Sequence, residues 1–391
     1  MKKAISVILS LILCLGMTSF VFASDQEMDD NYYYFTDRSG NEMKAPKHAF
    51  AKRVVSFTPG NPWTKIADDQ DPETTLGLPD YKSSEKRTNL CLGAGGVLIL
   101  EFDVAIYDGE GDDIYVFEVG GDVEATFVEV SRDLSIWYEA GKVGGATAGV
   151  DLEGKVPENS KFRYVRLTDQ KTSIYSSWPG ADIDAVSGLN SKAVTSDWAD
   201  NEMEEADKED LIPDSLKDKD LTKPITRAEF AGVSVKVYEN LGNTTALPAV
   251  INPFTDTTDL DVMKAFNVGI TNGIGDNLFA PDSLLNREQC ATMLTRVFKR
   301  STMPGWTLET DGQFRLDYVQ PALFADDSQI SGWARDSVYF MAANNIINGI
   351  GDNLFAPKNT TPEQEALGYA NATREQALVI SVRMVKNLKH T

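Results

Sequence analysis

Histidine and cysteine are scarce in this chain of 391 residues, which contains two histidines and three cysteines. His48 and His390 lie near opposite ends of the sequence, which argues against histidine-dependent catalysis and against a histidine-rich metal site. Cys14 falls in an apolar N-terminal run, and Cys91 and Cys290 lie far apart in the sequence. A disulfide framework is therefore not indicated, and we expect both later cysteines to be small buried apolar side chains.

Basic residues are the minority among the charged ones: 37 Lys and Arg stand against 59 Asp and Glu, for a net charge of −22. A nucleic-acid partner is excluded on this ground, because phosphate contacts need clustered Lys and Arg. The acidic balance fits a protein that stays soluble outside the cell. The length allows two or three domains.

The N-terminus has the pattern of a secretory signal peptide. A basic start is followed by an apolar stretch, and Val21 and Ala23 are small residues at a cleavage position before Ser24. We predict a signal peptide at residues 1–23 and a secreted product. The alternative is an uncleaved anchor, but polar breaks in the stretch favour cleavage and leave no membrane span in the mature chain. The cysteine in this stretch follows a poor lipobox, which argues against lipidation.

The mature chain divides into a β-rich half and a helical half. After a polar lead-in at 24–52, residues 53–190 hold short alternating segments separated by Gly and Asp turns, which predict a β-sandwich. The strand candidates are 96–102, 113–119, 126–130 and 162–167. A polar linker is expected at 191–197.

The helical half contains a repeat. The string NGIGDNLFAP occurs at 272–281 and, without a mismatch, at 348–357. Its Gly, Asn and Asp content is typical of a turn, and an unchanged string at long spacing indicates repeated units. Alignment around the string gives three units, at 198–241, 254–300 and 324–389; the first lacks the string.

Each unit also contains a tetrad that reads as a helix start. The tetrads TRAE, NREQ and TREQ begin at Thr226, Asn286 and Thr373. Their first residue is an N-cap, and the Glu or Gln at the fourth position completes a capping box. Their second residues are Arg227, Arg287 and Arg374. A cation there opposes the helix dipole, so we expect an anion bound at each; the alternative is that each Arg pairs with a neighbouring carboxylate.

The three units resemble S-layer homology domains. The resemblance is carried by the tetrads, by Phe254-Thr255-Asp256, by Trp333-Ala334 and by the Gly-x-Gly-x-x-x-Phe-x-Pro pattern of the repeated string. It covers about residues 195–389. It implies an all-α bundle of three repeats with pseudo-threefold symmetry. It also implies non-covalent attachment to secondary cell-wall polysaccharide at a bacterial surface, a ligand that in this family often carries a pyruvylated sugar.

The resemblance also implies which residues bind. Arg227, Arg287 and Arg374 would bind the ligand's carboxylate. Gly273, Gly275, Gly349 and Gly351 would let the turn backbone approach the sugar. Trp198 and Trp333 would stack on a sugar face, with a role as core anchors as the alternative. The sequence departs from the pattern in unit one, which lacks the glycine turn, and in unit two, which has no Trp after its Phe-Thr-Asp.

The β-rich half resembles a galactose-binding-like (discoidin-type) jelly roll, through Trp137-Tyr138, residues 163–167 and residues 179–186. Its expected ligand is a glycan or a protein, with a spacer role as the alternative. Four carboxylates are candidate Ca²⁺ ligands, and solvated acidic turns are the alternative. They are Asp112, Asp113, Asp182 and Asp184.

Three classes of function follow. The leading one is a non-catalytic surface protein, a β-sandwich displayed by the helical anchor. The second is an anchored glycoside hydrolase, which needs two carboxylates across a cleft. Glu118, Glu129 and Asp184 are available, but their spacing singles out no pair. The third is a subunit of an S-layer lattice.

Overall fold

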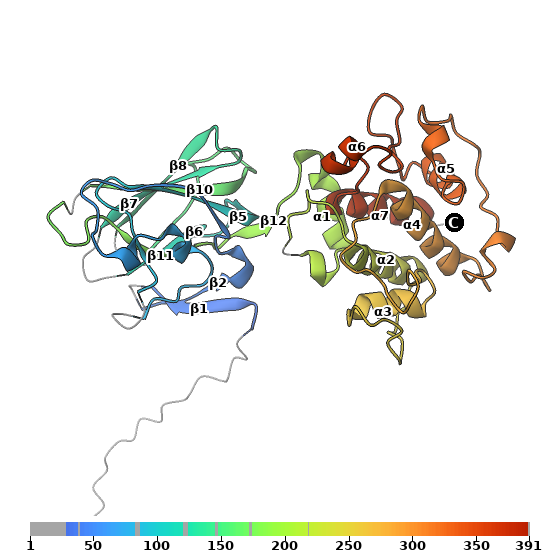
Figure 1. The fold of residues 1–391 in the computed structure, drawn as a ribbon, viewed down its shortest axis with the longest axis horizontal. Helices are drawn as coiled ribbons and strands as arrows, with labels where there is room; N and C mark the ends of the chain where they lie inside the picture. The colour runs from blue at the N-terminus through green and yellow to red at the C-terminus, as the bar shows by residue number, and fades with distance from the viewer. Residues whose placement is uncertain are drawn as a thin grey trace, which may run out of the picture.

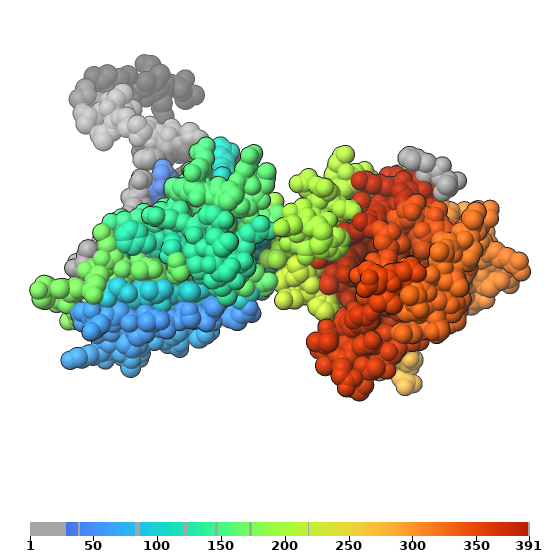
Figure 2. All heavy atoms as spheres, turned by 90° about the horizontal axis from the view of Figure 1, so that it is seen from above, coloured from blue at the N-terminus to red at the C-terminus, as the bar shows by residue number. Residues whose placement is uncertain are grey.

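The computed structural model describes residues 29–37, 40–82, 87–119, 124–144, 148–171, 174–217 and 219–389. The signal peptide predicted at 1–23 lies outside these residues. A β lobe and a helical lobe lie side by side (Figure 1). The space-filling view shows a narrow neck where they meet (Figure 2). The predicted division into a β-rich half and a helical half is confirmed.

Two antiparallel sheets form the β lobe, one of six strands in the order β12-β5-β10-β7-β8 with β3 also paired to β5, and one in the order β4-β11-β6-β9. The first contains β3 (Arg53–Thr58), β5 (Val97–Tyr107), β7 (Ala125–Ser131), β8 (Trp137–Gly144), β10 (Lys161–Asp169) and β12 (Ser191–Ala193). The second contains β4 (Leu90–Cys91), β6 (Ile114–Glu118), β9 (Ala148–Val150) and β11 (Asp182–Gly188). Alternate residues such as Leu98 and Leu100 on β5 share one buried core with Val116 and Ile183 of the other sheet.

Part of the expected lead-in is a hairpin of β1 (Tyr32–Thr36) and β2 (Glu42–Pro46). Alternation along β1 places Tyr33 and Phe35 on one face, where they pack against aromatic rings of the four-stranded sheet and of the segment that follows η1 (Lys47–Ala49). Those rings are Phe50, Tyr115 and Phe117. Because the hairpin covers the second face of this sheet, every residue of β6 is buried.

The helical lobe is built on three long helices that each begin at a tetrad arginine: α2 (Arg227–Gly242), α4 (Arg287–Thr302) and α7 (Arg374–Leu388). Shorter helices accompany them: α1 (Asp200–Lys208), α3 (Leu260–Asn267), α5 (Arg335–Ala343) and α6 (Pro362–Leu367). The helical lobe also has the 3-10 turns η5 (Asp197–Ala199), η6 (Asp214–Leu216), η7 (Asp311–Gln313) and η8 (Asp327–Gln329), whereas η1, η2 (Ala67–Asp69) and η3 (Pro72–Thr75) lie in the β lobe. One hydrophobic core contains residues of all these α-helices except α6, which has no buried residue.

The segments that precede the long helices hydrogen-bond to one another in a closed ring. The amide of Ile225 donates to Ala372, Ala372 to Leu285, and Leu285 back to Ile225, over 2.9, 3.0 and 3.2 Å. The ring brings the starts of α2, α4 and α7 together. Among the described residues, no helix is both long and apolar enough to cross a bilayer.

Candidate functional site

The three tetrads form capping boxes, as predicted. Each N-cap side chain accepts a hydrogen bond from the backbone of the third helical residue, and that residue's side chain accepts one from the N-cap amide. The three pairs are Thr226 with Glu229, Asn286 with Gln289, and Thr373 with Gln376. The boxes fix the start of each helix and so fix where each arginine emerges.

Among the described residues, Arg287 donates hydrogen bonds to neutral acceptors only. Its Nε donates to the carbonyl of Phe355 (2.8 Å), its Nη2 to the carbonyl of Asn348 (3.0 Å) and its Nη1 to Oε1 of Gln376 (3.3 Å). The guanidinium lies over the Phe355 ring, 5.3 Å from its centroid. Burial lowers the pKa of Arg287, because the charged form has lost water. An anion at this place would restore the lost stabilisation of the cation.

Arg227 has the same kind of surroundings. Its Nη2 donates to the carbonyl of Asn272 (2.6 Å) and to Oγ1 of Thr271 (3.3 Å), and its guanidinium lies 4.8 Å from the centroid of the Phe279 ring. Burial, and then the positive charge of Arg296, lower the pKa of Arg227. Arg227 and Arg287 therefore have similar surroundings, each with neutral hydrogen-bond acceptors and a phenylalanine ring.

Arg374 differs, because a carboxylate of this chain already binds it. Its Nε and Nη2 donate to the two oxygens of Glu229, at 3.0 and 2.8 Å, and its Nη1 donates to the carbonyl of Asp220 at 2.9 Å. The alternative considered from the sequence, pairing with a neighbouring carboxylate, is therefore what the structure shows at Arg374.

A cavity of about 310 Å³ opens beside Arg287. Trp198 from the first unit, Arg287 from the second and Gly349 and Gln376 from the third line it together. Arg383, about two turns after Gln376 on α7, also lines the cavity and forms an ion pair with Glu202 at 2.7 Å. The indole of Trp198 is about half exposed, at 54%. The cavity thus offers an aromatic face and a cation to one ligand.

The glycines of the repeated string serve the turn itself. Gly275 and Gly351 have φ of 110° and 113°, which side-chain-bearing residues rarely adopt. A Cβ on Gly273 would lie 2.6 Å from the carbonyl oxygen of Leu278, and one on Gly349 would lie 2.5 Å from that of Leu354. Of the four, Gly349 lines the cavity beside Arg287.

The aspartate of the Phe-x-Asp segment, for which the sequence predicted no role, holds the glycine turn in units two and three. Asp256 accepts from the amides of Phe279 and Ala280, and Asp326 accepts from those of Phe355 and Ala356, at 2.7–3.1 Å. The two alanines adopt φ of 58° and 55°, a strained conformation that these bonds stabilise. The sequence signal was the Phe-x-Asp that opens units two and three.

Two glutamates position the tryptophan segments. Glu375 accepts from the amide and hydroxyl of Ser196 (2.8 and 2.9 Å), two residues before Trp198. Glu288 makes the same pair of bonds to Ser331 (both 2.8 Å), two residues before the half-exposed Trp333. The signal was the Glu at the second helical position of NREQ and TREQ. In TRAE the second helical position is an alanine, Ala228. Unit two follows unit one around the ring, and unit two has no tryptophan equivalent to Trp198 and Trp333 for such a glutamate to position.

The four aspartates expected as Ca²⁺ ligands lie at opposite ends of the β6–β11 pair. Asp113 precedes β6 at the end where Ile114 pairs with Gly188, whereas Asp182 and Asp184 lie where Ile183 pairs with Glu118. A single site of all four is therefore excluded, because the strand pair separates them.

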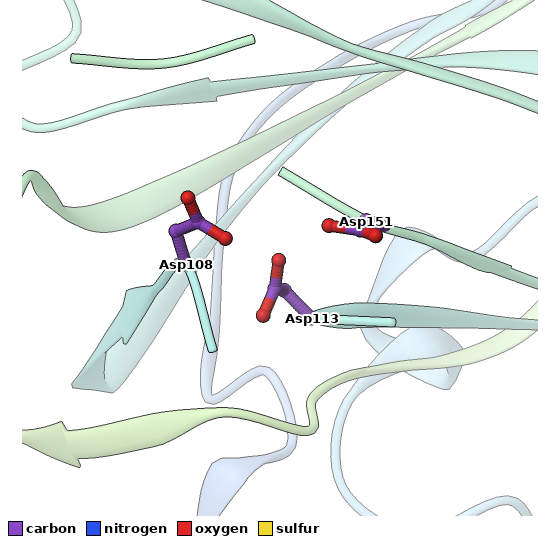
Figure 3. Close-up of side chains that lie close together, drawn as sticks. All are labelled: Asp108, Asp113 and Asp151. Carbon is purple, nitrogen blue, oxygen red and sulfur yellow. The ribbon is translucent and has the colours of Figure 1, made fainter. Parts of the chain in front are cut away.

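A different acidic group forms around Asp113. Its carboxylate lies with those of Asp108 and Asp151, with one oxygen of each within 4.8 Å of the others (Figure 3). Burial and the charges of the other two raise the pKa of Asp108. Oxygens at this spacing suit Ca²⁺, but both oxygens of Asp113 already accept hydrogen bonds, from Gly109 and Asn190 and from Leu152.

The carboxylates considered for glycoside hydrolysis are all engaged within the β lobe. Glu129 holds Arg166 through both oxygens. Glu118 and Asp184 are each 4% exposed, and Asp184 accepts from the amides of Asp80 and Tyr81. None of these three side chains lines the cavity beside Arg287.

Comparison with known proteins identifies one unit. The family model of the S-layer homology domain matches residues 323–366. An amylopullulanase of Thermoanaerobacterium thermosulfurigenes is 28% identical over 149 residues, which cover 37% of this chain and 7% of that protein. Exoglucanase XynX of Acetivibrio thermocellus is 29% identical over 150 residues (37% and 12%), and an endoglucanase of a Bacillus species is 28% identical over 173 (43% and 16%). This chain thus spans no more than 16% of the length of these three relatives.

Similarity to solved structures is low. The C-terminal domain of a chitobiase from Bacteroides fragilis aligns at 15% identity with a TM-score of 0.25, over 38% of this chain and 97% of that one. The CBM51-2 and INT domains of Clostridium perfringens ZmpB align at 15% identity with a TM-score of 0.21, over 54% and 45%. The family match, together with the turn and helix geometry described above, shows that this chain carries an S-layer homology domain at residues 323–366.

Proposed function

We propose that the helical lobe consists of three S-layer homology repeats, at 198–241, 254–300 and 324–389, arranged about a pseudo-threefold axis. The closed ring of hydrogen bonds among the segments before α2, α4 and α7 supports this arrangement. So do the three capping boxes, which place equivalent arginines around the ring. In this proposal the lobe anchors the protein non-covalently to the cell wall at a bacterial surface.

The ligand we propose is a secondary cell-wall polysaccharide with a carboxylate group, such as a pyruvylated sugar. The observation that carries the proposal is the cavity beside Arg287, where three units contribute to one site. The exposed face of Trp198 suits the apolar face of a sugar ring. Arg287, desolvated and bonded to neutral acceptors, suits a carboxylate.

For the β lobe we propose that it is a non-catalytic β-sandwich, held at the cell surface by the helical lobe, that binds glycan or protein. The buried or ion-paired state of Glu118, Glu129 and Asp184 supports the absence of a hydrolytic pair. Release of reducing sugar from cell-wall or plant polysaccharide by the purified chain would contradict this part of the proposal and favour an anchored hydrolase.

The test of the anchor is binding of the chain to purified cell-wall sacculi before and after the secondary polysaccharide is stripped. We expect binding to need the polysaccharide and to weaken at least about 10-fold in Arg287→Ala, because a charge-assisted contact contributes about 1.5–3 kcal/mol. Arg300→Ala is the matched control, since Arg300 is an exposed residue near the other end of α4. Binding that survives both stripping and Arg287→Ala would refute the proposal.

A further inference from the structure

The three tetrad arginines occupy equivalent places, but two of them contact different side chains at the third helical position of the next unit around the ring. Arg287 meets the neutral amide of Gln376, whereas Arg374 meets the carboxylate of Glu229. The residue at the same position of α4 is Gln289, again neutral. A single carboxylate therefore distinguishes the third place from the other two.

From this difference we infer that the chain has two ligand positions, at Arg287 and Arg227, and that the third, at Arg374, is permanently occupied by its own Glu229. Both oxygens of Glu229 bind the guanidinium, through Nε and Nη2. The inference rests on the proposed function, and it also supports the class of ligand. An arginine in this setting holds a carboxylate in a two-bond geometry, so the open positions suit a carboxylate as well.

The loop of the first unit keeps the third position closed. In place of the glycine turn it presents Asp220, whose carbonyl accepts from Nη1 of Arg374. The Asp220 side chain is 6% exposed and pairs with Arg163 of β10, at 2.9 Å. The β lobe thus covers the place where units two and three have an open turn. The departure of unit one from the repeat pattern is explained if this unit docks the sandwich instead of binding ligand.

The charge environment agrees with two open positions. Burial is the largest cause that lowers the pKa of Arg227 and of Arg287. Among the described residues, neither arginine forms an ion pair with a carboxylate. Arg374 has Glu229 at 2.8 Å. Two cations therefore still gain from an external anion, and the third has its anion within the chain.

The experiment follows the side-chain Nε–H signals of arginine in the full mature chain labelled with ¹⁵N-arginine. Signals are assigned with single Arg→Lys variants at Arg227, Arg287 and Arg374. The probe is the pyruvate 4,6-ketal of methyl glucopyranoside, and the uncharged methyl glucopyranoside is the control. We expect the ketal to shift the signals of Arg227 and Arg287 and to leave that of Arg374 in place.

Glu229→Gln recreates at the third position the neutral residue of the other two. We expect the Arg374 signal to respond to the ketal in this variant, and the unchanged response of Arg287 reports that the lobe is folded. A wild-type Arg374 that responds with the same midpoint as Arg287 would overturn the inference alone. So would an Arg374 that stays silent in folded Glu229→Gln, because Glu229 would then not be the occupant. If the ketal shifts none of the three arginine signals in the wild type, both this inference and the proposed function would be overturned.

Discussion

At the residue scale, Asp182 shows how burial changes an acidic side chain. Burial, and then the charge of Asp69, raise the pKa of Asp182 from the ordinary 3.8 to about 7. Asn89 donates a hydrogen bond to it at 3.3 Å, and its own buried Oδ1 has no hydrogen-bond partner among the described residues. At neutral pH the carboxyl group of Asp182 therefore carries a proton for part of the time.

The raised pKa of Asp182 predicts how the stability of the β lobe depends on pH. Between about pH 4 and pH 7 the folded lobe holds a proton that the unfolded chain has lost, so the free energy of unfolding falls as the pH rises through this window. Asp182→Asn removes that loss. We expect the melting temperature of the β lobe to rise by a few degrees at pH 8 and to change little at pH 4.

The matched control is Asp103→Asn, which removes one charge from an exposed position of β5. Its melting temperature should change little at either pH. Equal gains for the two variants at pH 8 would mean that relief of the overall negative charge, and not burial of Asp182, is responsible.

At the scale of the element, the repeated string is a turn whose sequence is set by its backbone. Gly349 lies so close to the carbonyl of Leu354 that a methyl group has no room. We expect Gly349→Ala to lower the free energy of unfolding by about 1–3 kcal/mol, since backbone atoms must move apart. Because Gly349 also lines the cavity of Arg287, binding to sacculi should weaken.

Gly312→Ala is the control for this element, because a Cβ there meets nothing within 4 Å and its φ is ordinary. Chemical denaturation with both variants measures the difference. If Gly349→Ala is as stable as Gly312→Ala and binds sacculi normally, the short distance between Gly349 and the carbonyl of Leu354 is not what requires glycine in the repeated string.

The elements that local chemistry determines could be predicted from the sequence, and those that distant contacts determine could not. The capping boxes follow from residues three positions apart, and all three were predicted. Asp326 acts on an amide 29 residues away, and Glu375 on a serine 179 residues away, so spacing alone did not reveal them. The hairpin of β1 and β2 was read as a lead-in, because its polar residues hide the alternation of Tyr33 and Phe35.

At the scale of the whole molecule, the two lobes are joined by a strand and by charges. The segment expected as a linker contributes β12, which pairs with β5 along Ser191–Ala193 and leads directly into η5 and α1. Within the described part of the chain, three ion pairs cross the neck: Arg132 with Asp197, Lys161 with Asp200, and Arg163 with Asp220. The neck in Figure 2 is therefore a structured junction.

Arg163 is the centre of that junction, since it forms ion pairs with Glu101 of its own lobe and Asp220 of the other, each at 2.9 Å. Glu101 also pairs with Arg53, so removal of Arg163 mainly leaves the nearly inaccessible carboxylate of Asp220 without its nearest cation. We expect Arg163→Ala to lower the free energy of unfolding by about 3 kcal/mol. The spread of interlobe distances in small-angle scattering should also widen.

Arg132→Ala provides the comparison, because its pair with Asp197 is largely exposed and should contribute less than about 1 kcal/mol. Since Asp220 also holds Arg374 through its carbonyl, a freed Asp220 loop loosens the third position of the ring as well. Loss of the ion pair between the β lobe and Asp220 would then also disturb the helical lobe that we propose as the anchor. If Arg163→Ala behaves like Arg132→Ala in both measurements, β12 alone joins the lobes, and the sandwich does not control the first repeat.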